Sequence, residues 1–469
     1  MDKINLLSQS TSIIITIIIC FLFTLIGISY SKKFQGKDNY LVANRSVGLF
    51  SLTTSFVASA LGAWILFGPA SAATWGGIGA VTGYALGTAF PLFILIYLGE
   101  KFRNTFPKCK SLIEVIRLRF GNKLFKLILV LSIFYMTIFL IAEVTAVSIL
   151  LNYISGTDLW ITASIVILSS LLYTLYGGLR ASIFTDNIQF VVFLILLLIA
   201  YSYLTFFNSD IFSFEFIKSN KPILLRTDYI PNFTAGLTFF IAVAATNLFH
   251  QGNWQRVFSA KNNFILKSSL IYSSIIIFFI VFWMGYSGLI SYSINSKVIP
   301  DLAFFDLILN KKNSVVVIGI LILAMSLTLS TIDTLINAIS SLIIINGDQI
   351  NKKLDGKGIK NKTNLIILLL SILVFILASK GYSILYLFLL ADLLCCAAVV
   401  TIFYGFFNKQ INSNLAAFCI ICGLIFGLLF FPSPNFQNSI LVGNLIPIDN
   451  FSIFIKSNLL FISFAISLI

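Results

Sequence analysis

Nine Ser, Thr, Asp and Asn residues fall within sixteen positions of an otherwise apolar stretch that begins at Ser326. Ser326, Ser330, Asp333 and Asn337 recur at spacings of three or four, so a helix presents them on one face, with Thr334 beside them. Hydroxyls in such a helix are often structural, because they bond the carbonyl one turn earlier or join two helices. A carboxylate in mid-membrane costs about 2.5 to 3.5 kcal/mol and therefore indicates function. Together these oxygens are ligands for a hard cation.

Two other stretches combine apolar residues with helix breakers. Gly62, Gly68 and Pro69 interrupt one of them, and the polar run 250–253 (His-Gln-Gly-Asn) interrupts another. A pair of interrupted membrane helices at matching positions of two halves indicates a transporter site. Open backbone at membrane depth is tolerated only where it lines a cavity or is buried in protein.

Three further ionisable residues lie in apolar surroundings. Glu143 and Asp392 each have two interpretations, pairing with a polar neighbour for structure or lining the path of an ion or solute. Their carboxylates are also the groups that proton coupling would use. His250, the single histidine, is placed to contact solute, to relay protons or simply to end a helix.

The elements that position these residues must be membrane helices. Of the 469 residues, 58% are hydrophobic and 10% charged, with a mean hydropathy of +1.00. A soluble domain carries about 25% charge, so a soluble dehydrogenase or a nucleic-acid enzyme is excluded. The net charge of +14 is then first an orientation signal. The six cysteines include five in apolar runs, and the pair Cys419 and Cys422 lacks further metal ligands nearby.

Apolar runs between charged breaks predict thirteen spans. They cover residues 10–30, 49–74, 78–99, 124–153, 158–176, 181–206, 233–252, 264–291, 314–345, 363–379, 382–407, 413–431 and 450–469. Lys456 interrupts the last of these, so whether it spans is left open. With the N-terminus outside, 20 Lys and Arg fall in inner loops and eight in outer segments. This asymmetry predicts an outer N-terminus and an inner C-terminus.

A motif joins the fifth and sixth spans. It reads Tyr-Thr-x-x-Gly-Gly-Leu-x-Ala over residues 173–181 and continues with Thr185, Asp186 and Gln189. The glycines allow a tight turn, and Thr185 with Asp186 would be suited to cap the next helix. The string also resembles the signature of the sodium:solute symporter family. Residues 251–256 (Gln-Gly-Asn-Trp-Gln-Arg) and 330–334 (Ser-Thr-Ile-Asp-Thr) are similar to two further elements of that family, and the resemblance runs from about 40 to 407.

The resemblance implies a sodium site. Backbone carbonyls at the break of the second span would meet oxygens of the ninth, which assigns sodium to the residues Ala58, Leu61, Leu327, Ser330 and Thr331. Asp186 matches the acid on the family's sodium exit route, and Asp333 and Thr334 are added to that path. Ala60 departs from the pattern, because some amino-acid-transporting members carry an aspartate there; this argues against the proline branch.

The solute cavity is expected between the broken spans and spans 3 and 11. Its candidate binding residues are Ser59, Gly62, Trp64, Tyr84, Gln251 and Trp254. These offer amides, hydroxyls and aromatic faces without a cationic anchor, which favours a small neutral or zwitterionic solute over an anion. The run 62–69 resembles the urea and polyamine branch of the family, so urea or a related nitrogenous compound is the predicted solute.

The resemblance therefore implies an all-α polytopic membrane protein with a five-plus-five inverted-repeat (LeuT-like) core. A first peripheral helix and loop (1–40) precede the two repeats (41–208 and 209–408), and peripheral C-terminal helices (409–469) follow. The predicted function is sodium-driven solute uptake across the plasma membrane, with a sodium/proline-type or proton-coupled symporter as alternatives. A passive channel or a membrane sensor represents a different class.

The expected ligands follow from this function. No Walker-type phosphate loop occurs in the sequence, so no nucleotide cofactor is predicted, and sodium is expected as a co-transported ligand rather than as a cofactor. One histidine and scattered acids argue against an enzyme. The expected partners are the solute, sodium and lipid, with no nucleic acid; the oligomeric state is left open.

Overall fold

The chain is helical throughout the part that a computed structural model describes. This part comprises residues 6–32, 36–207, 210–310, 313–350, 356–434, 436, 439 and 458–468. Its only β pairing consists of two isolated bridges, Val47 with Ala260 and Pro432 with Ser439. The apolar residues thus lie in helices, as the sequence predicts. A helix satisfies its own backbone hydrogen bonds, which a bilayer requires.

Ten helices of the described residues are long and apolar enough to cross a membrane. They are α1 (Gln9–Ser31), α4 (Gly68–Thr105), α6 (Asn122–Ser155), the part Gly178–Phe206 of α7 (Leu159–Phe207), α9 (Ile230–Phe249), α11 (Asn263–Ile294), α13 (Ser314–Ile350), α14 (Gly356–Ala378), α15 (Ile384–Phe407) and α16 (Ser413–Phe430). Three shorter apolar helices are α3 (Leu49–Ala60), the part Leu159–Leu172 of α7, and α19 (Leu459–Leu468).

Short helices connect these elements. They are α2 (Lys37–Val42), α5 (Leu112–Phe120), α8 (Phe214–Asn220), α10 (Gln251–Ser259) and α12 (Ala303–Ile308), with the 3₁₀ turns η1 (Ala43–Arg45), η2 (Ala63–Leu66), η3 (Pro222–Leu225) and η4 (Pro300–Leu302). Each of the ten long and three short apolar helices overlaps a predicted span. Helix α4 overlaps two, because it begins within the second span and continues through the third. For the last predicted span, residues 450–457 lie outside the described part, and α19 has 10 residues where a spanning helix needs about 20.

Both predicted helix breaks are present. The second span is divided, since α3 ends at Ala60, Leu61 is extended (φ −103°, ψ 93°), and η2 begins at Ala63. The seventh is divided at His250 (φ −63°, ψ 116°), between α9 and α10. Two sharp bends occur at glycines with positive φ, Gly77 in α4 and Gly178 in α7. The predicted turn between the fifth and sixth spans therefore lies at Gly178.

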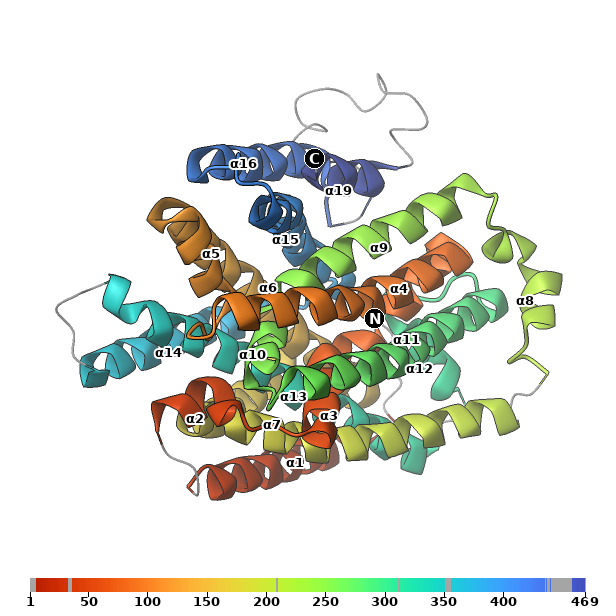
Figure 1. The fold of residues 1–469 in the computed structure, drawn as a ribbon. Helices are drawn as coiled ribbons and strands as arrows, with labels where there is room; N and C mark the ends of the chain where they lie inside the picture. Colours follow the sequence, from red (N-terminus) through yellow and green to blue (C-terminus); the bar gives the residue numbers. More distant parts are fainter. Residues whose placement is uncertain are drawn as a thin grey trace.

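Small residues bring α4, α9 and α11 close together, and Figure 1 shows these three helices lying alongside one another. A Cβ atom at Gly83 would lie 2.1 Å from the carbonyl oxygen of Gly236, and one at Gly79 would lie 1.8 Å from that of Asn232. Because lipid tails are as apolar as the side chains, the hydrophobic effect does not hold membrane helices together. Close backbone packing of this kind stabilises their association instead. These helices are therefore closely packed beside the two breaks.

Candidate functional site

The break of α3 faces the polar side of α13. Oγ of Ser330 lies 3.2 Å from the carbonyl oxygen of Ala58, and Oγ1 of Thr331 lies 3.2 Å from the carbonyl oxygen of Leu327. An ideal Cβ at Gly62, the residue after Leu61, would lie 2.7 Å from Oγ1 of Thr331. The two segments predicted to share sodium are therefore in direct contact, and all five predicted ligand residues are buried.

The oxygens at this contact suit an alkali ion. Carbonyl and hydroxyl oxygens are hard ligands, which favour Na⁺ and similar ions over soft metals. Across the described residues no cluster of three or more His, Cys, Asp or Glu is placed to hold another metal. The sodium assignment to these five residues stays a prediction, supported by their proximity.

Asp186 lies at the centre of a buried polar network. Its carboxylate accepts from Oγ of Ser55 at 2.6 Å, from Oγ of Ser330 at 2.7 Å and from Nη2 of Arg256 at 2.6 Å. The Asp186 and Arg256 side chains have no solvent exposure. Thr334 of α13, which is also predicted on the sodium path, accepts a bond from the same guanidinium at 3.0 Å.

Asp333 lies apart from this network. Its two carboxylate oxygens accept from Thr174 and Thr185, each at 3.2 Å. The interpretation of Thr185 and Asp186 as a helix cap is wrong, because both lie inside α7 and Oγ1 of Thr185 donates back to the carbonyls of Ala181 and Ser182. The helix continues through this point, so its N–H groups need no cap.

One helix, α6, contacts both breaks. Oε2 of Glu143 accepts from the backbone N–H of Ala63 at 2.9 Å, which satisfies a free donor at the start of η2. The Tyr135 hydroxyl accepts from the N–H of Gln251 at 3.2 Å and donates to the carbonyl of Phe249 at 3.4 Å. These contacts hold the interrupted backbone in place on both sides of the site.

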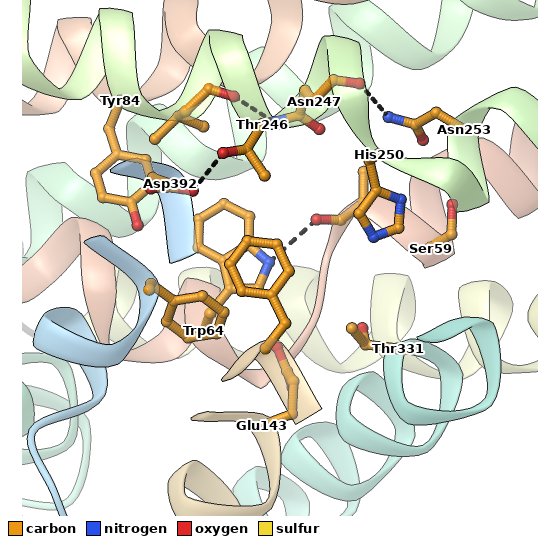
Figure 2. Close-up of a pocket in the computed structure, with 14 residues that line it drawn as sticks. Ser59, Trp64, Tyr84, Glu143, Thr246, Asn247, His250, Asn253, Thr331 and Asp392 are labelled. Carbon is orange, nitrogen blue, oxygen red and sulfur yellow. Dashed lines mark hydrogen bonds between the residues drawn. The ribbon is translucent and has the colours of Figure 1, made fainter. Parts of the chain in front are cut away.

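A cavity of about 60 Å³ lies between the two breaks. Figure 2 shows side chains from α3, η2, α4, α6, α9, α10, α13 and α15 around it. The Trp64 ring stacks on Tyr84 with centroids 5.4 Å apart, and Oδ1 of Asp392 accepts from Thr246 at 2.7 Å. The lining residues are Ser59, Ala60, Trp64, Tyr84, Phe139, Glu143, Val243, Thr246, Asn247, His250, Asn253, Thr331, Phe388 and Asp392.

Half of the predicted solute residues line this cavity. Ser59, Trp64 and Tyr84 do so, whereas Gly62 lies beside it, against Glu143 and Thr331. Trp254 is fully buried, donates from Nε1 to the Leu248 carbonyl at 2.7 Å and stacks on a phenylalanine of α4. Gln251 is buried at the second break, also outside the lining.

Glu143, Asp392 and His250, for which the sequence leaves several roles open, all line the cavity. Thr246, Asn247 and Asn253 were missed as candidates. A single polar residue in an apolar helix carries little signal, since most such residues bond their own helix, as Asn247 does with the Val243 carbonyl at 3.0 Å. The lining contains two carboxylates and, within the described residues, neither Lys nor Arg.

Comparison with known proteins gives one family over most of the chain. Residues 40–423 match the model of the sodium:solute symporter family. A spermidine transporter of Candida albicans is 26% identical over 409 residues, which cover 86% of this chain and 75% of that protein. A sodium/glucose cotransporter 4 of Danio rerio is 26% identical over 306 residues, covering 59% of this chain and 46% of that protein.

Solved structures share the fold. A sodium-coupled sialic acid symporter in a substrate-bound outward-open state superposes with a TM-score of 0.74 at 17% identity, over 97% of this chain and 96% of the other. A nucleobase-cation-symport-1 family transporter in a closed conformation superposes with a TM-score of 0.52 at 12% identity, over 92% and 93% of the two chains. The all-helical, LeuT-like architecture expected from the sequence is therefore confirmed.

Proposed function

Since the chain belongs to the sodium:solute symporter family, we propose that it imports a small polar nitrogen-containing solute by sodium-coupled alternating access. The family consists of secondary transporters, so this multi-pass membrane protein is a transporter and not an enzyme. The transported ligands of such a protein are a small solute and sodium.

The observation that carries the proposal is the shared position of Thr331. Its hydroxyl lies on the predicted sodium side of α13, and its side chain also lines the cavity. Sodium at Ala58, Leu61, Leu327, Ser330 and Thr331 would fix the break of α3, whose neighbours Ser59 and Trp64 line the same cavity. Binding of the ion then orders the solute site, which is the coupling that symport requires.

The cavity supports a small nitrogenous solute. One water needs about 10 to 15 Å³ of such volume, so about 60 Å³ holds roughly four to six non-hydrogen atoms. Two carboxylates and the stacked faces of Trp64 and Tyr84 suit a protonated amine, which cation–π contact would also hold. The similarity to a spermidine transporter favours the same chemistry. Urea has the right size and remains the neutral candidate.

Orientation and energetics complete the proposal. The distribution of Lys and Arg supports an outer N-terminus, an inner C-terminus and insertion in the plasma membrane, with two inverted repeats at 41–208 and 209–408. One charge that crosses 100 mV is worth about 2.3 kcal/mol, which supports roughly 50-fold accumulation of solute. In a proton-coupled mechanism, Glu143 and Asp392 would carry the proton. Uptake measured with a sodium gradient and with a proton gradient distinguishes the two mechanisms.

The experiment is uptake by purified protein in sealed proteoliposomes. Labelled putrescine, urea, proline and glucose are offered with an inward sodium gradient, with an inward proton gradient and with neither. Concentrative uptake of putrescine or urea that requires sodium supports the proposal. Uptake driven by the proton gradient alone would show that protons, and not sodium, are the coupling ion. Flux that only equilibrates the solute would indicate a passive channel.

A further inference from the structure

Arg256 is an arginine without solvent exposure in a membrane protein. It lies on α10, and each of the three nitrogens of its guanidinium group has a hydrogen-bond partner. Nη2 donates to Oδ2 of Asp186 at 2.6 Å and to Oγ1 of Thr334 at 3.0 Å, and Nε donates to the carbonyl and Oγ of Ser55 at 3.1 and 2.7 Å. Nη1 donates to the carbonyl of Gly252 at 3.0 Å. One side chain thus joins α10 to α3, α7 and α13.

The carboxylate that Arg256 holds also contacts a predicted sodium ligand. Oδ1 of Asp186 accepts from Oγ of Ser330 at 2.7 Å, while Oδ2 faces the guanidinium. The same hydroxyl is 3.2 Å from the carbonyl of Ala58, which is a second predicted ligand. Of the five atoms expected to bind sodium, Oγ of Ser330 is therefore one hydrogen bond away from the ion pair, and the carbonyl oxygen of Ala58 is one contact further.

The direction of the Ser330 proton decides whether this hydroxyl is able to bind a cation. A hydroxyl coordinates sodium through its lone pairs, so its proton must point to another acceptor. If that proton points at the carbonyl of Ala58, both oxygens are occupied with each other. If it points at Oδ1 of Asp186, the lone pairs of Ser330 and the carbonyl of Ala58 are both free. A carboxylate is the stronger acceptor because its charge shortens and strengthens the bond.

We propose that Arg256 is a positioning residue for sodium: it fixes the Asp186 carboxylate so that Ser330 turns its lone pairs toward the ion. Arg256 acts through Asp186 and does not touch sodium itself. Because Arg256 belongs to α10, a change in the sodium site at the break of α3 would be transmitted to α10, the inner part of the second broken helix. This inference rests on the proposed function and adds a residue that links the ion to the opposite break.

The test is the sodium dependence of uptake in Arg256→Lys. An ammonium has no planar fork, so it is unable to bond Ser55 and Asp186 in the present geometry. We expect the sodium concentration for half-maximal uptake to rise about tenfold, with the solute KM at saturating sodium changed less than twofold. Sodium titration of tryptophan fluorescence gives the same shift without transport.

Arg103→Lys is the matched control. Arg103 also joins a neighbouring helix, α4, to the end of α10, through the carbonyls of Val257 and Ala260 at 2.9 and 2.8 Å, but it bonds no carboxylate among the described residues. If both variants shift the sodium dependence equally, Arg256 is only a structural tie and the inference is overturned. An unchanged sodium dependence in Arg256→Lys, or a change confined to solute KM, also overturns it.

A second variant removes the risk of a buried lone charge. Asp186→Asn with Arg256→Gln replaces both charged groups by neutral amides and leaves no unpaired ion, so the protein should fold. Its neutral amide oxygen is a weaker acceptor for Ser330, and we expect the sodium requirement to rise here too. Wild-type sodium dependence in this double variant contradicts the inference. Sodium-independent uptake by the wild type would instead contradict the proposed function.

Discussion

The carboxylate of Glu143 accepts a hydrogen bond from the backbone N–H of Ala63 at 2.9 Å, which fixes the start of η2 to α6. Its other oxygen, Oε1, has no partner among the described residues and faces Gly62, next to the cavity. One side chain therefore supports the broken backbone and also places a carboxylate oxygen beside the cavity proposed for the solute. Because an unpaired buried charge is costly, it indicates that a ligand or a proton completes this site.

Replacement of Glu143 by Gln separates these two roles. The amide oxygen of Gln still accepts from Ala63, but the charge is lost. If the solute is a protonated amine, we expect its half-saturation concentration to rise about tenfold or more, because bonds to charged groups contribute about 1.5 to 3 kcal/mol. Competition by unlabelled putrescine and urea against a labelled solute measures this effect.

Asp392→Asn on α15 is the companion to this variant, since its carboxylate lies on the same cavity and bonds Thr246. Urea binding should be unaffected by both substitutions. Equal weakening of urea and putrescine would show that the carboxylates shape the cavity rather than recognise charge.

The sodium ligands are tested by Ser330→Ala and Thr331→Ala. Each removes a hydroxyl oxygen from the contact between α13 and the α3 break. We expect the sodium concentration for half-maximal uptake to rise at least fivefold in each variant, with the amount of protein in the membrane unchanged. Thr328→Val is the control, since this buried hydroxyl on the same helix has no partner in the described part of the chain. Unchanged sodium activation in both alanine variants would remove these residues from the site.

The sequence predicted the helices and both breaks because their signals are local. Apolar runs of about 20 residues and the breakers Gly62 and Gly252 are visible without any tertiary contact. The polar face of α13 was equally predictable, because its polar residues recur at spacings of three and four. The cavity was harder to predict, because its lining depends on which face of each helix points inward. Trp254 and Ser59 both stand next to a break, yet only Ser59 reaches the cavity.

Buried partners were the least predictable part. The bond between Arg256 and Asp186 joins residues 70 positions apart, and that between Ser330 and Asp186 joins residues 144 positions apart. No periodicity links such pairs. The contact of α6 with both breaks was unpredictable for the same reason, since Glu143 taken alone is equally suited to a structural pair or to a transport path.

Gly62→Ala is expected to abolish transport. A Cβ at this position would lie 2.1 Å from Oε1 of Glu143 and 2.7 Å from Oγ1 of Thr331, so the added methyl group enters the contact between the break, α6 and α13. Overpacking of this kind costs about 1 to 3 kcal/mol and would displace residues proposed to bind the ion and the solute. Sodium-dependent uptake and the melting temperature of purified protein measure the two effects.

Gly48→Ala provides the control for that substitution at the other end of α3. A Cβ there meets nothing within 4 Å, and its backbone conformation suits any residue. We expect uptake within twofold of the wild type. If Gly62→Ala transports as well as Gly48→Ala, the close contact at the break is not needed for function.

Asp301 gives a pH-dependent prediction outside the membrane-spanning helices. Its carboxylate accepts from Oγ of Ser71 at 2.9 Å, from Oγ of Ser383 at 3.2 Å and from the N–H of Ile384 at 3.3 Å, so it ties η4 to α4 and α15. Burial raises the pKa of Asp301 above its ordinary value of 3.8, and these three bonds only partly oppose the shift. The folded protein therefore holds this proton more tightly than the unfolded chain does.

The sign of the effect follows from that difference. Where the folded pKa is raised, the contribution to stability is full below the unfolded pKa and is lost as the pH rises through the folded pKa. Relative to Asp301→Asn, the wild type should gain melting temperature as the pH falls toward 4. Asp228→Asn is the opposite control, because the hydrogen bond from Arg226 lowers the pKa of the exposed Asp228, and its contribution is lost as the pH falls. Equal pH slopes for the two variants in melting experiments would show that burial of Asp301 does not control its protonation.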